Sequence, residues 1–327
     1  MKHYVGCDLG GTNLRAAVVD TEAGTVSGLT SQPTLAREGP EAVLARMAEV
    51  VRAAITASGI DRSEVGGVGV TAPGRLDLEN GRTQFLPNLP GNWPNVPVRD
   101  SLAAAVNLPV HLLNDARAMT LGEWAYGAGR GVDSMACFGI GTGIGGGLIL
   151  GGRLYLGLGG NSAELGHTVI DFNGPPCGCG NRGCVETYAS GSAITAMGLK
   201  AVTQGLTTSL GERVGYDLNR INPKVIYEAA RAGDAIAQDI YERAGLYLGI
   251  AVANVVTTVG ASRVVIGGGV AQAGDLLLDP IRRTLKERVH IVPAEQTEIV
   301  PAELGPNAGL IGVARWASQM VAAPERG

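Results

Sequence analysis

The stretch HYVGCDLGGTNLRAAVVD, residues 3–20, decides the fold because its pattern returns in MACFGIGTGIGGGLIL, residues 135–150. Each stretch is an apolar run, a turn rich in glycine and threonine, and a second apolar run, which is typical of two antiparallel strands. Aligning Cys7 with Cys137 places Gly11-Thr12 on Gly141-Thr142, an offset of 130 residues. This repeat predicts two related α/β lobes that face each other.

The rest of the chain supplies strands and helices for both lobes, and 327 residues are too many for one ordinary core. Apolar runs predict further strands over 24–31, 65–74, 109–113 and 264–270. Helical spacing predicts helices over 40–58, 98–106, 115–126, 191–202, 223–231, 234–258, 274–289 and 307–322. Residues 75–97 are predicted as a loop. We expect mixed sheets with helices packed on both faces.

Composition excludes several classes of protein. The net charge of -4 and the isoelectric point near 5.7 disfavour nucleic acid or an anionic membrane as the main partner. No uninterrupted apolar stretch approaches twenty residues, so no membrane span is expected. The N-terminal residues lack the pattern of a secretory signal, which favours the cytoplasm.

Three of the five cysteines crowd into eight residues and follow a histidine. His167, Cys177, Cys179 and Cys184 offer one imidazole and three thiolates, enough for a closed tetrahedral Zn²⁺ site with a structural role. A disulfide is disfavoured because Cys177 and Cys179 are too close for an easy bridge and one thiol would remain. Cys7 and Cys137 lie in apolar strands and are predicted to be inert core residues.

The two glycine-rich turns are candidate phosphate sites. In D8-L-G-G-T-N13, Asp8 offers a carboxylate for Mg²⁺ and the turn offers amides for phosphate, although a plain hairpin turn has the same composition. In residues 139–147 six of nine residues are glycine, which favours a phosphate-binding loop over a purely structural turn. Two such turns on two lobes predict a nucleotide between them. Gly267–Gly269, after a buried strand, fit either a base or ribose site or a tight strand–helix turn.

Polar residues elsewhere suggest a second substrate. Asp115 follows an apolar strand in LLND and begins a helix; alone, an Asn-Asp pair is better explained as a helix cap. A helix N-terminus is expected to lower the pKa of Asp115 and keep it ionised, able to accept a hydroxyl proton. Glu164, Glu186 and the segment N88-L-P-G-N-W93 carry groups that bind sugar hydroxyls, although solvated loop charge is the alternative for each alone.

Together these motifs closely resemble the ROK family (repressor, open reading frame, kinase), and within it the ATP-dependent glucokinases. The most specific stretch is E164-L-G-H167 followed by C177-G-C-G-N-R-G-C184-V-E186. The resemblance spans the chain and implies a two-lobed, actin-like (ribonuclease H-like) ATPase fold with mixed sheets and an active site in the interlobe cleft. It also implies a small lobe of residues 1–114 with about 309–327, and a large lobe of 115–308 that holds the zinc loop 167–184.

The resemblance also implies the function and the residues that carry it. The expected reaction moves the γ-phosphate of ATP, with Mg²⁺, to the 6-hydroxyl of a hexose, with Asp115 as the base. The sugar contacts implied are Gly74, Asn88, Asn114, Asp115, Glu164, His167 and Glu186. The contacts implied for ATP and Mg²⁺ are Asp8, Gly10, Gly11, Thr12, Asn13, Thr142, Gly143, Gly268 and Gly269. A homodimer or homotetramer is expected.

Several alternatives remain open from sequence. Asn92 stands between Gly91 and Trp93, where glucokinases of this family often have Gly-Trp directly, so fructose, mannose, N-acetylmannosamine or allose could replace glucose. Polyphosphate could replace ATP. From other classes, the rivals are a sugar-responsive regulator without turnover and a zinc-ribbon nucleic-acid binder. Asp8 lies too near the first residue for a preceding DNA-binding domain, which disfavours the repressor branch.

Overall fold

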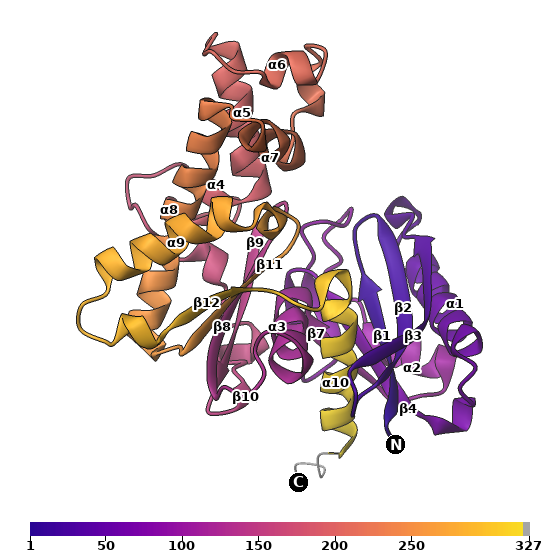
Figure 1. Cartoon of the computed structure of the whole chain (residues 1–327). Coiled ribbons are helices and arrows are strands. Elements are labelled where there is room, and N and C mark those ends of the chain that lie inside the picture. The colour runs from indigo at the N-terminus through magenta and orange to yellow at the C-terminus, as the bar shows by residue number, and fades with distance from the viewer. Residues whose placement is uncertain (323–327) are drawn as a thin grey trace.

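The computed structural model describes residues 1–322, and the N-terminal half is built on a five-stranded mixed sheet (Figure 1). Its strand order is β3-β2-β1-β4-β7, with β1–β3 antiparallel and β1, β4 and β7 parallel. The strands are β1 (His3–Leu9), β2 (Asn13–Asp20), β3 (Thr25–Pro33), β4 (Val65–Ala72) and β7 (Val110–Asn114). The predicted meander of three strands is confirmed.

The second sheet repeats the topology of the first. Its order is β10-β9-β8-β11-β12, again with an antiparallel half and a parallel half. The strands are β8 (Ser134–Ile140), β9 (Ile144–Leu150), β10 (Arg153–Leu154), β11 (Arg263–Gly267) and β12 (Glu298–Pro301). In the pairing register Leu9↔Leu14 corresponds to Ile140↔Ile144, so the second hairpin turn is one residue shorter than the first. The predicted repeat is therefore confirmed, but its alignment shifts by one residue in the first strand, where Cys7 corresponds to Phe138 rather than Cys137 and Asp8 corresponds to Gly139.

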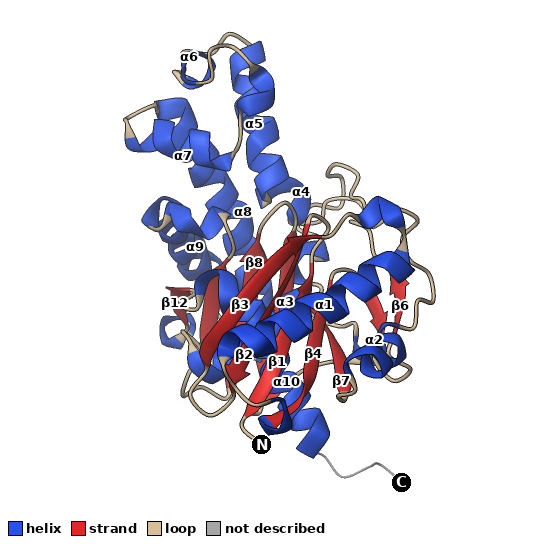
Figure 2. Ribbon diagram, turned by 90° about the vertical axis from the view of Figure 1, so that its right-hand side faces the viewer, coloured by secondary structure: helices blue, strands red, loops and turns tan. Residues whose placement is uncertain are grey.

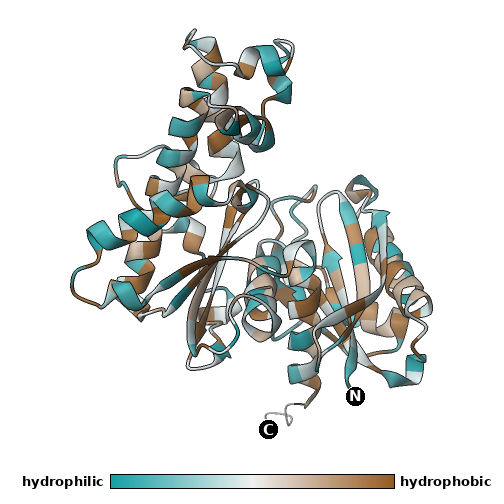
Figure 3. Ribbon diagram, in the orientation of Figure 1, coloured by the Kyte–Doolittle hydropathy of each residue, from teal (hydrophilic) through white to brown (hydrophobic). Residues whose placement is uncertain are grey.

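Helices cover both sheets and bury a separate core against each (Figure 2). α1 packs against β2 and β3, and α2 packs against α1 and β7, while α8 and α9 pack against each other beside the second sheet. These and the other helices, apart from short 3₁₀ turns, are α1 (Pro40–Ser58), α2 (Val98–Val106), α3 (Asp115–Tyr126), α4 (Glu186–Ala189), α5 (Gly191–Thr203), α6 (Leu210–Arg213), α7 (Pro223–Arg231), α8 (Ala235–Val259), α9 (Asp275–Arg288) and α10 (Ala308–Ala322). Hydrophobic residues are most prominent in the strands of the second sheet, whereas β3 and helices α5–α9 mix both kinds along their length (Figure 3).

Two helices, α3 and α10, cross between the sheets (Figure 1). Each follows the last strand of one sheet and packs on the other: α3 contacts β8 and β9, and α10 contacts β1 and β4. The crossing is close because a Cβ on Gly122 would lie 2.4 Å from the Ala308 carbonyl oxygen, and one on Gly312 would lie 1.7 Å from that of Ala118. The boundary at residues 114/115 stays a prediction.

Short elements differ from the predictions. Residues 75–97, predicted as loop, contain a hairpin of β5 (Arg75–Asp77) and β6 (Arg82–Phe85), and β12 was not predicted. The last helix ends at Ala322, and positions 323–327 of the predicted segment 309–327 lie outside the described residues. Within residues 1–322, no helix has both the length and the apolar character needed to cross a bilayer.

Candidate active site

The candidate site begins where three parallel strands of the first sheet end. Asp8 lies near the end of β1, Thr71 opposite it on β4, and Asn114 at the end of β7. The carboxyl ends of parallel strands form one edge, where ligands of α/β proteins commonly bind. Thr71 Oγ1 donates a hydrogen bond to Asp8 Oδ1. Burial raises the pKa of Asp8, against the lowering effects of the Thr71 hydrogen bond and the Arg15 charge.

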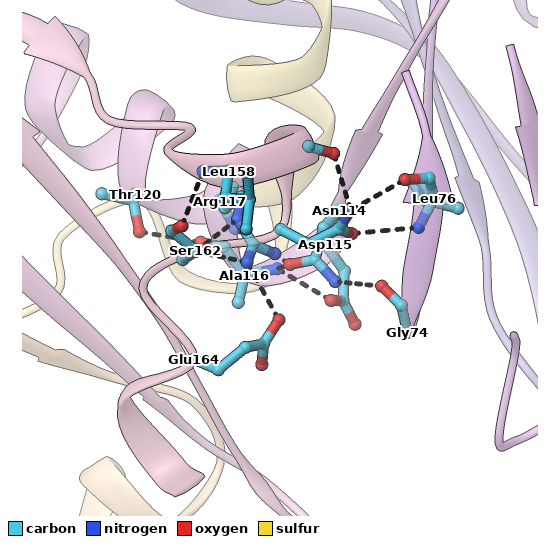
Figure 4. A network of polar contacts seen from close by, with 12 residues as sticks. Gly74, Leu76, Asn114, Asp115, Ala116, Arg117, Thr120, Leu158, Ser162 and Glu164 are labelled. Atoms are coloured by element: carbon cyan, nitrogen blue, oxygen red, sulfur yellow. Dashed lines mark hydrogen bonds and ion pairs between the residues drawn. The ribbon is translucent and has the colours of Figure 1, made fainter. Parts of the chain in front are cut away.

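Asn114 joins this edge to helix α3. Its Oδ1 accepts hydrogen bonds from the backbone N–H groups of Ala116 (3.0 Å) and Arg117 (3.3 Å), so Asn114 caps the helix. Its Nδ2 donates to the Gly74 carbonyl at 3.3 Å (Figure 4). Gly74 has φ +79°, and a Cβ there would lie 2.2 Å from the Phe85 carbonyl oxygen, which explains the glycine structurally. Asn114 is therefore the N-cap of α3, and Asp115 does not serve as the cap.

Asp115 is the first residue of α3, and its pKa moves opposite to the prediction. Its side chain keeps contact with solvent, but surrounding protein desolvates the carboxylate and raises the pKa from 3.8 to about 6. The nearby carboxylates of Asp8 and Glu164 raise it further, whereas the Ala116 N–H, at 2.8 Å, and Arg117 lower it. The expected lowering by the helix N-terminus is therefore wrong, because desolvation outweighs the local helix contribution.

Glu164 approaches this edge from a loop of the C-terminal half. Its carboxylate is nearly half exposed and accepts a hydrogen bond from Arg117 Nη2 at 2.9 Å (Figure 4). The Arg117 side chain is 1 % exposed, and its Nε also donates to the Ser162 carbonyl at 3.0 Å. The network therefore brings together the predicted residues Gly74, Asn114, Asp115 and Glu164.

The first glycine turn lies beside the sugar loop, residues 88–93, which was predicted to contact the sugar. The Gly10 N–H donates to the Asn13 carbonyl at 3.1 Å, which closes the turn and leaves Gly11 and Thr12 exposed. A Cβ on Gly11 would lie 3.1 Å from the Asn88 carbonyl oxygen, so Asn88 is adjacent to this turn. Exposed backbone of this kind can approach a phosphate closely.

The second glycine turn, within residues 139–147, is held by residues that follow the cysteine loop 167–184. Glu186 Oε2 accepts a hydrogen bond from the Ile144 N–H at 2.8 Å, and a Cβ on Gly143 would lie 2.3 Å from the same oxygen. The Thr142 carbonyl accepts from Ser192 Oγ at 2.9 Å, at the start of α5. Glu186 thus joins the second turn to the cysteine loop.

Gly268 and Gly269 follow β11, the neighbour of β8. Gly268 has φ +88°, and a Cβ would lie 2.4 Å from the Ile140 carbonyl oxygen. The tight turn alone accounts for Gly268, whereas a Cβ on Gly269 would meet no atom within 4 Å. Their assignment to ATP stays a prediction.

The four predicted metal ligands form one cluster. The donor atoms of His167, Cys177, Cys179 and Cys184 all lie within 4.8 Å of one another, and the five cysteines of the chain are free thiols. The Cys179 and Cys184 sulfurs are 3.7 Å apart, and His167 Nδ1 is 3.6 Å from the Cys177 sulfur. A tetrahedral zinc site with Zn–S bonds of about 2.3 Å places two sulfurs about 3.8 Å apart, so the cluster fits the ion.

The additional Asn92 is absorbed by a left-handed turn. Gly91, Asn92 and Trp93 have φ values of +74°, +54° and +45°. The Asn92 carbonyl accepts a hydrogen bond from the Leu86 N–H at 2.9 Å, and Trp93 remains buried at 2 % exposure. Trp93 therefore belongs to the first core, with Asn92 in a left-handed conformation directly before it.

Sequence reasoning missed Arg117, Thr71 and Ser162. Arg117 lies two residues after Asp115 in a helix whose neighbouring positions are apolar, and that placement was the available signal. Thr71 and Ser162 contribute through strand pairing and a backbone carbonyl, which leave no local signature.

The two similar sheets, the crossing helices and the edge of carboxylates define the actin-like ATPase fold. The ROK family model matches residues 4–320, and this chain belongs to the ROK family. A glucokinase of Thermotoga maritima is 38 % identical over 310 residues, 95 % of each chain. A Streptomyces griseus ROK glucokinase, solved with glucose and AMPPNP, is 34 % identical with a TM-score of 0.82 and covers 97 % of this chain and 99 % of its own. A Bacillus subtilis xylose repressor is 30 % identical over 95 % of this chain and 76 % of its own.

Proposed function

We propose that this chain transfers the γ-phosphate of ATP to the 6-hydroxyl of a hexose, with glucose as the main acceptor. The observation that carries the proposal is Asp115, a carboxylate with a pKa of about 6 beside Glu164 and Asp8. The similarity to a glucokinase solved with glucose and AMPPNP supports the choice of substrates.

ATP is placed against the two glycine turns in this proposal. The turn closed by Gly10 offers the exposed backbone of Gly11 and Thr12 to the phosphates, and the second turn offers that of Thr142 with Gly143 beside it. Gly11 also lies next to Asn88, in the segment predicted to contact the sugar. Asp8, which accepts a hydrogen bond from Thr71 and lies near the Arg15 charge, contributes negative charge for Mg²⁺ bound with ATP. Phosphoryl transfer needs mainly alignment and charge stabilisation, which these groups supply.

Asp115 acts as the base toward the sugar hydroxyl. A pKa of about 6 leaves the carboxylate mostly ionised at neutral pH and still basic enough to accept a proton as the hydroxyl attacks phosphorus. Asn114, Glu164, His167 and Glu186 orient the sugar, with Gly74 and Asn88 bordering it.

A structural Zn²⁺ completes the proposal. His167, Cys177, Cys179 and Cys184 would hold the ion, which leaves no open position for hydrolytic chemistry. Glu186 comes two residues after Cys184, and its Oε1 lies 3.8 Å from the Cys177 sulfur. The cluster therefore orients a residue that also touches the second glycine turn.

A sugar-responsive regulator without turnover is the second candidate, favoured by the similarity to a xylose repressor. One coupled ADP-release assay separates the two, run with a panel of hexoses and with ATP or polyphosphate as donor. Turnover with glucose and ATP supports the kinase; sugar binding without ADP release would support the regulator.

The variant Asp115→Asn tests the base. We expect a loss of turnover of roughly 10²–10⁴-fold with hexose affinity nearly intact. Asp275→Asn is a matched control because Asp275 also begins a helix, α9, and lies outside the proposed site. Retention of most activity in Asp115→Asn would refute the role of Asp115.

A further inference from the structure

We propose that Arg117 is a positioning residue that holds Glu164 at the sugar site; this inference rests on the proposed function. Arg117 lies in α3, two residues after the expected base Asp115, and its side chain is 1 % exposed. Within the described residues, Glu164 is the one carboxylate that pairs with it.

The geometry gives the guanidinium two tasks at once. Arg117 Nε and Nη2 both donate to the Ser162 carbonyl, and Nη2 also donates to Glu164 Oε1 at 2.9 Å. One rigid group therefore fixes the backbone at 162 and the carboxylate at 164. The planar fork limits both the position and the direction of Glu164.

The loop that carries Glu164 has a second attachment, on the N-terminal half. Asn161 Oδ1 accepts from the Leu76 N–H at 3.1 Å, and its Nδ2 donates to the Leu76 carbonyl at 3.0 Å. Asn161 fixes the loop to β5, but it does not reach the Glu164 side chain. Ala163, between the two attachments, has a left-handed backbone conformation with φ +65°.

Burial makes the arginine sensitive to the loss of its partner. Arg117 Nη1 is buried and has no hydrogen-bond partner among residues 1–322, so the guanidinium depends on nearby carboxylates, with Glu164 as its ion-pair partner and Asp115 close enough for its pKa to be lowered. Glu164 is 44 % exposed and remains hydrated without Arg117. Removing Arg117 should therefore free Glu164 rather than bury an unpaired carboxylate.

A double-mutant cycle tests this role. Arg117→Met is expected to lower kcat/KM for the hexose about tenfold, mainly through KM, with KM for ATP unchanged. In a Glu164→Ala background the same change should alter kcat/KM by less than about twofold, because the group it positions is gone. Equal losses in both backgrounds would show that Arg117 acts only on overall structure and would overturn the proposal.

Hydrogen exchange gives a readout independent of activity. Arg117→Met should speed amide exchange across residues 158–165. The matched control, Arg263→Met, removes an arginine that donates to Glu298 and to the Ala128 and Arg130 carbonyls and should leave that segment unchanged. Unchanged exchange in Arg117→Met would also overturn the proposal.

Arg117→Lys covers the case in which Arg117→Met fails to fold. It keeps the charge but loses the planar fork, so the same loss in KM and the same faster exchange are expected. Full hexose kcat/KM and unchanged exchange in Arg117→Lys would contradict the role of the fork. A wild-type chain inactive on every hexose would refute the proposed function, while the exchange measurements would still decide whether Arg117 holds the loop.

Discussion

The two hairpins β1–β2 and β8–β9 occupy equivalent places in equivalent sheets, yet one row of paired residues near their turns differs in character. In the first sheet Asp8 pairs with Arg15 on one side and Thr71 on the other. The equivalent Gly139 pairs with Gly145 and Gly267. The row Arg15–Asp8–Thr71 of the first sheet therefore carries charges and a hydroxyl. The equivalent row of the second sheet, Gly145–Gly139–Gly267, consists of glycines.

Each row matches what packs against it. Arg15 reaches the chain just before α10, where it donates to the Pro306 carbonyl at 2.9 Å and to Asn307 Oδ1 at 2.7 Å. The glycine row instead leaves room for α3, since a Cβ on Gly139 would lie 2.8 Å from the Met119 methyl. The row of the first sheet thus supplies charge for the proposed chemistry, and the row of the second sheet brings backbone and helix close together.

The largest expected effect concerns the metal cluster, which is built by the C-terminal half. Purified protein should contain about one zinc per chain, and Cys179→Ser should lose it, because a closed site needs four ligands. Loss of the ion should cost about 10 kcal/mol of local folding free energy around residues 168–186. Metal analysis with thermal unfolding measures both, and Cys137→Ala, outside the cluster, is the control. Zinc-free wild-type protein would remove the site.

The second prediction compares substitutions at equivalent positions of the two rows, Asp8 and Gly139. Asp8→Asn should lower turnover on the order of 10²-fold, because it removes charge aimed at the phosphates and Mg²⁺. Gly139→Ala, at the equivalent position, should stay within about threefold because the new methyl meets only the flexible end of Met119. Steady-state assays with varied Mg²⁺ compare them, and similar losses in both variants would contradict the division of roles.

The third prediction concerns the pH dependence of kcat/KM, which follows the ionisation of Asp115. The pKa of Asp115 is about 6. A base must be ionised, so kcat/KM should fall about tenfold per pH unit below that value and level off above it. A pH–rate profile measures this limb. A rate independent of pH between 5 and 7 would show that Asp115 does not act as the base.

The smallest effect is on stability. The pKa of Asp115 is raised from 3.8 to about 6, so the ionised carboxylate destabilises the folded chain above pH 6, and this cost vanishes below about 3.8. Because Asp115 is exposed and solvent screens its charge, Asp115→Asn should raise Tm only slightly at pH 7.5, with a smaller gain near pH 4. Calorimetry at both pH values tests the sign, and a lower Tm at pH 7.5 would contradict it.

Glycine-rich turns and apolar runs made the two sheets predictable, because the hairpins are local and the repeat links them. The hairpin β5–β6 and the strand β12 were missed because they are short and form their pairs through tertiary context. The cluster of His167, Cys177, Cys179 and Cys184 was predictable from spacing alone, since only 9, 1 and 4 residues lie between its successive members.

The pKa of Asp115 could not be predicted in the same way. The helix end is local and visible, but the desolvation and the carboxylates of Asp8 and Glu164 come from distant segments. Arg117 was missed for a related reason. An arginine on a helix is usually exposed, and only the fold shows that Ser162 and Glu164 enclose it.

The position of α10 has a consequence for folding during synthesis on the ribosome. Ala314 and Ala317 of this helix bury Tyr4 and Val19, and Gly6 of β1 touches its backbone. The ribosome makes the first sheet early and α10 last, with residues 115–307 between them. At about 5–20 residues per second the first sheet waits roughly 10–40 s with one apolar face uncovered. The half of the molecule that is synthesised first is therefore completed only when the last helix emerges.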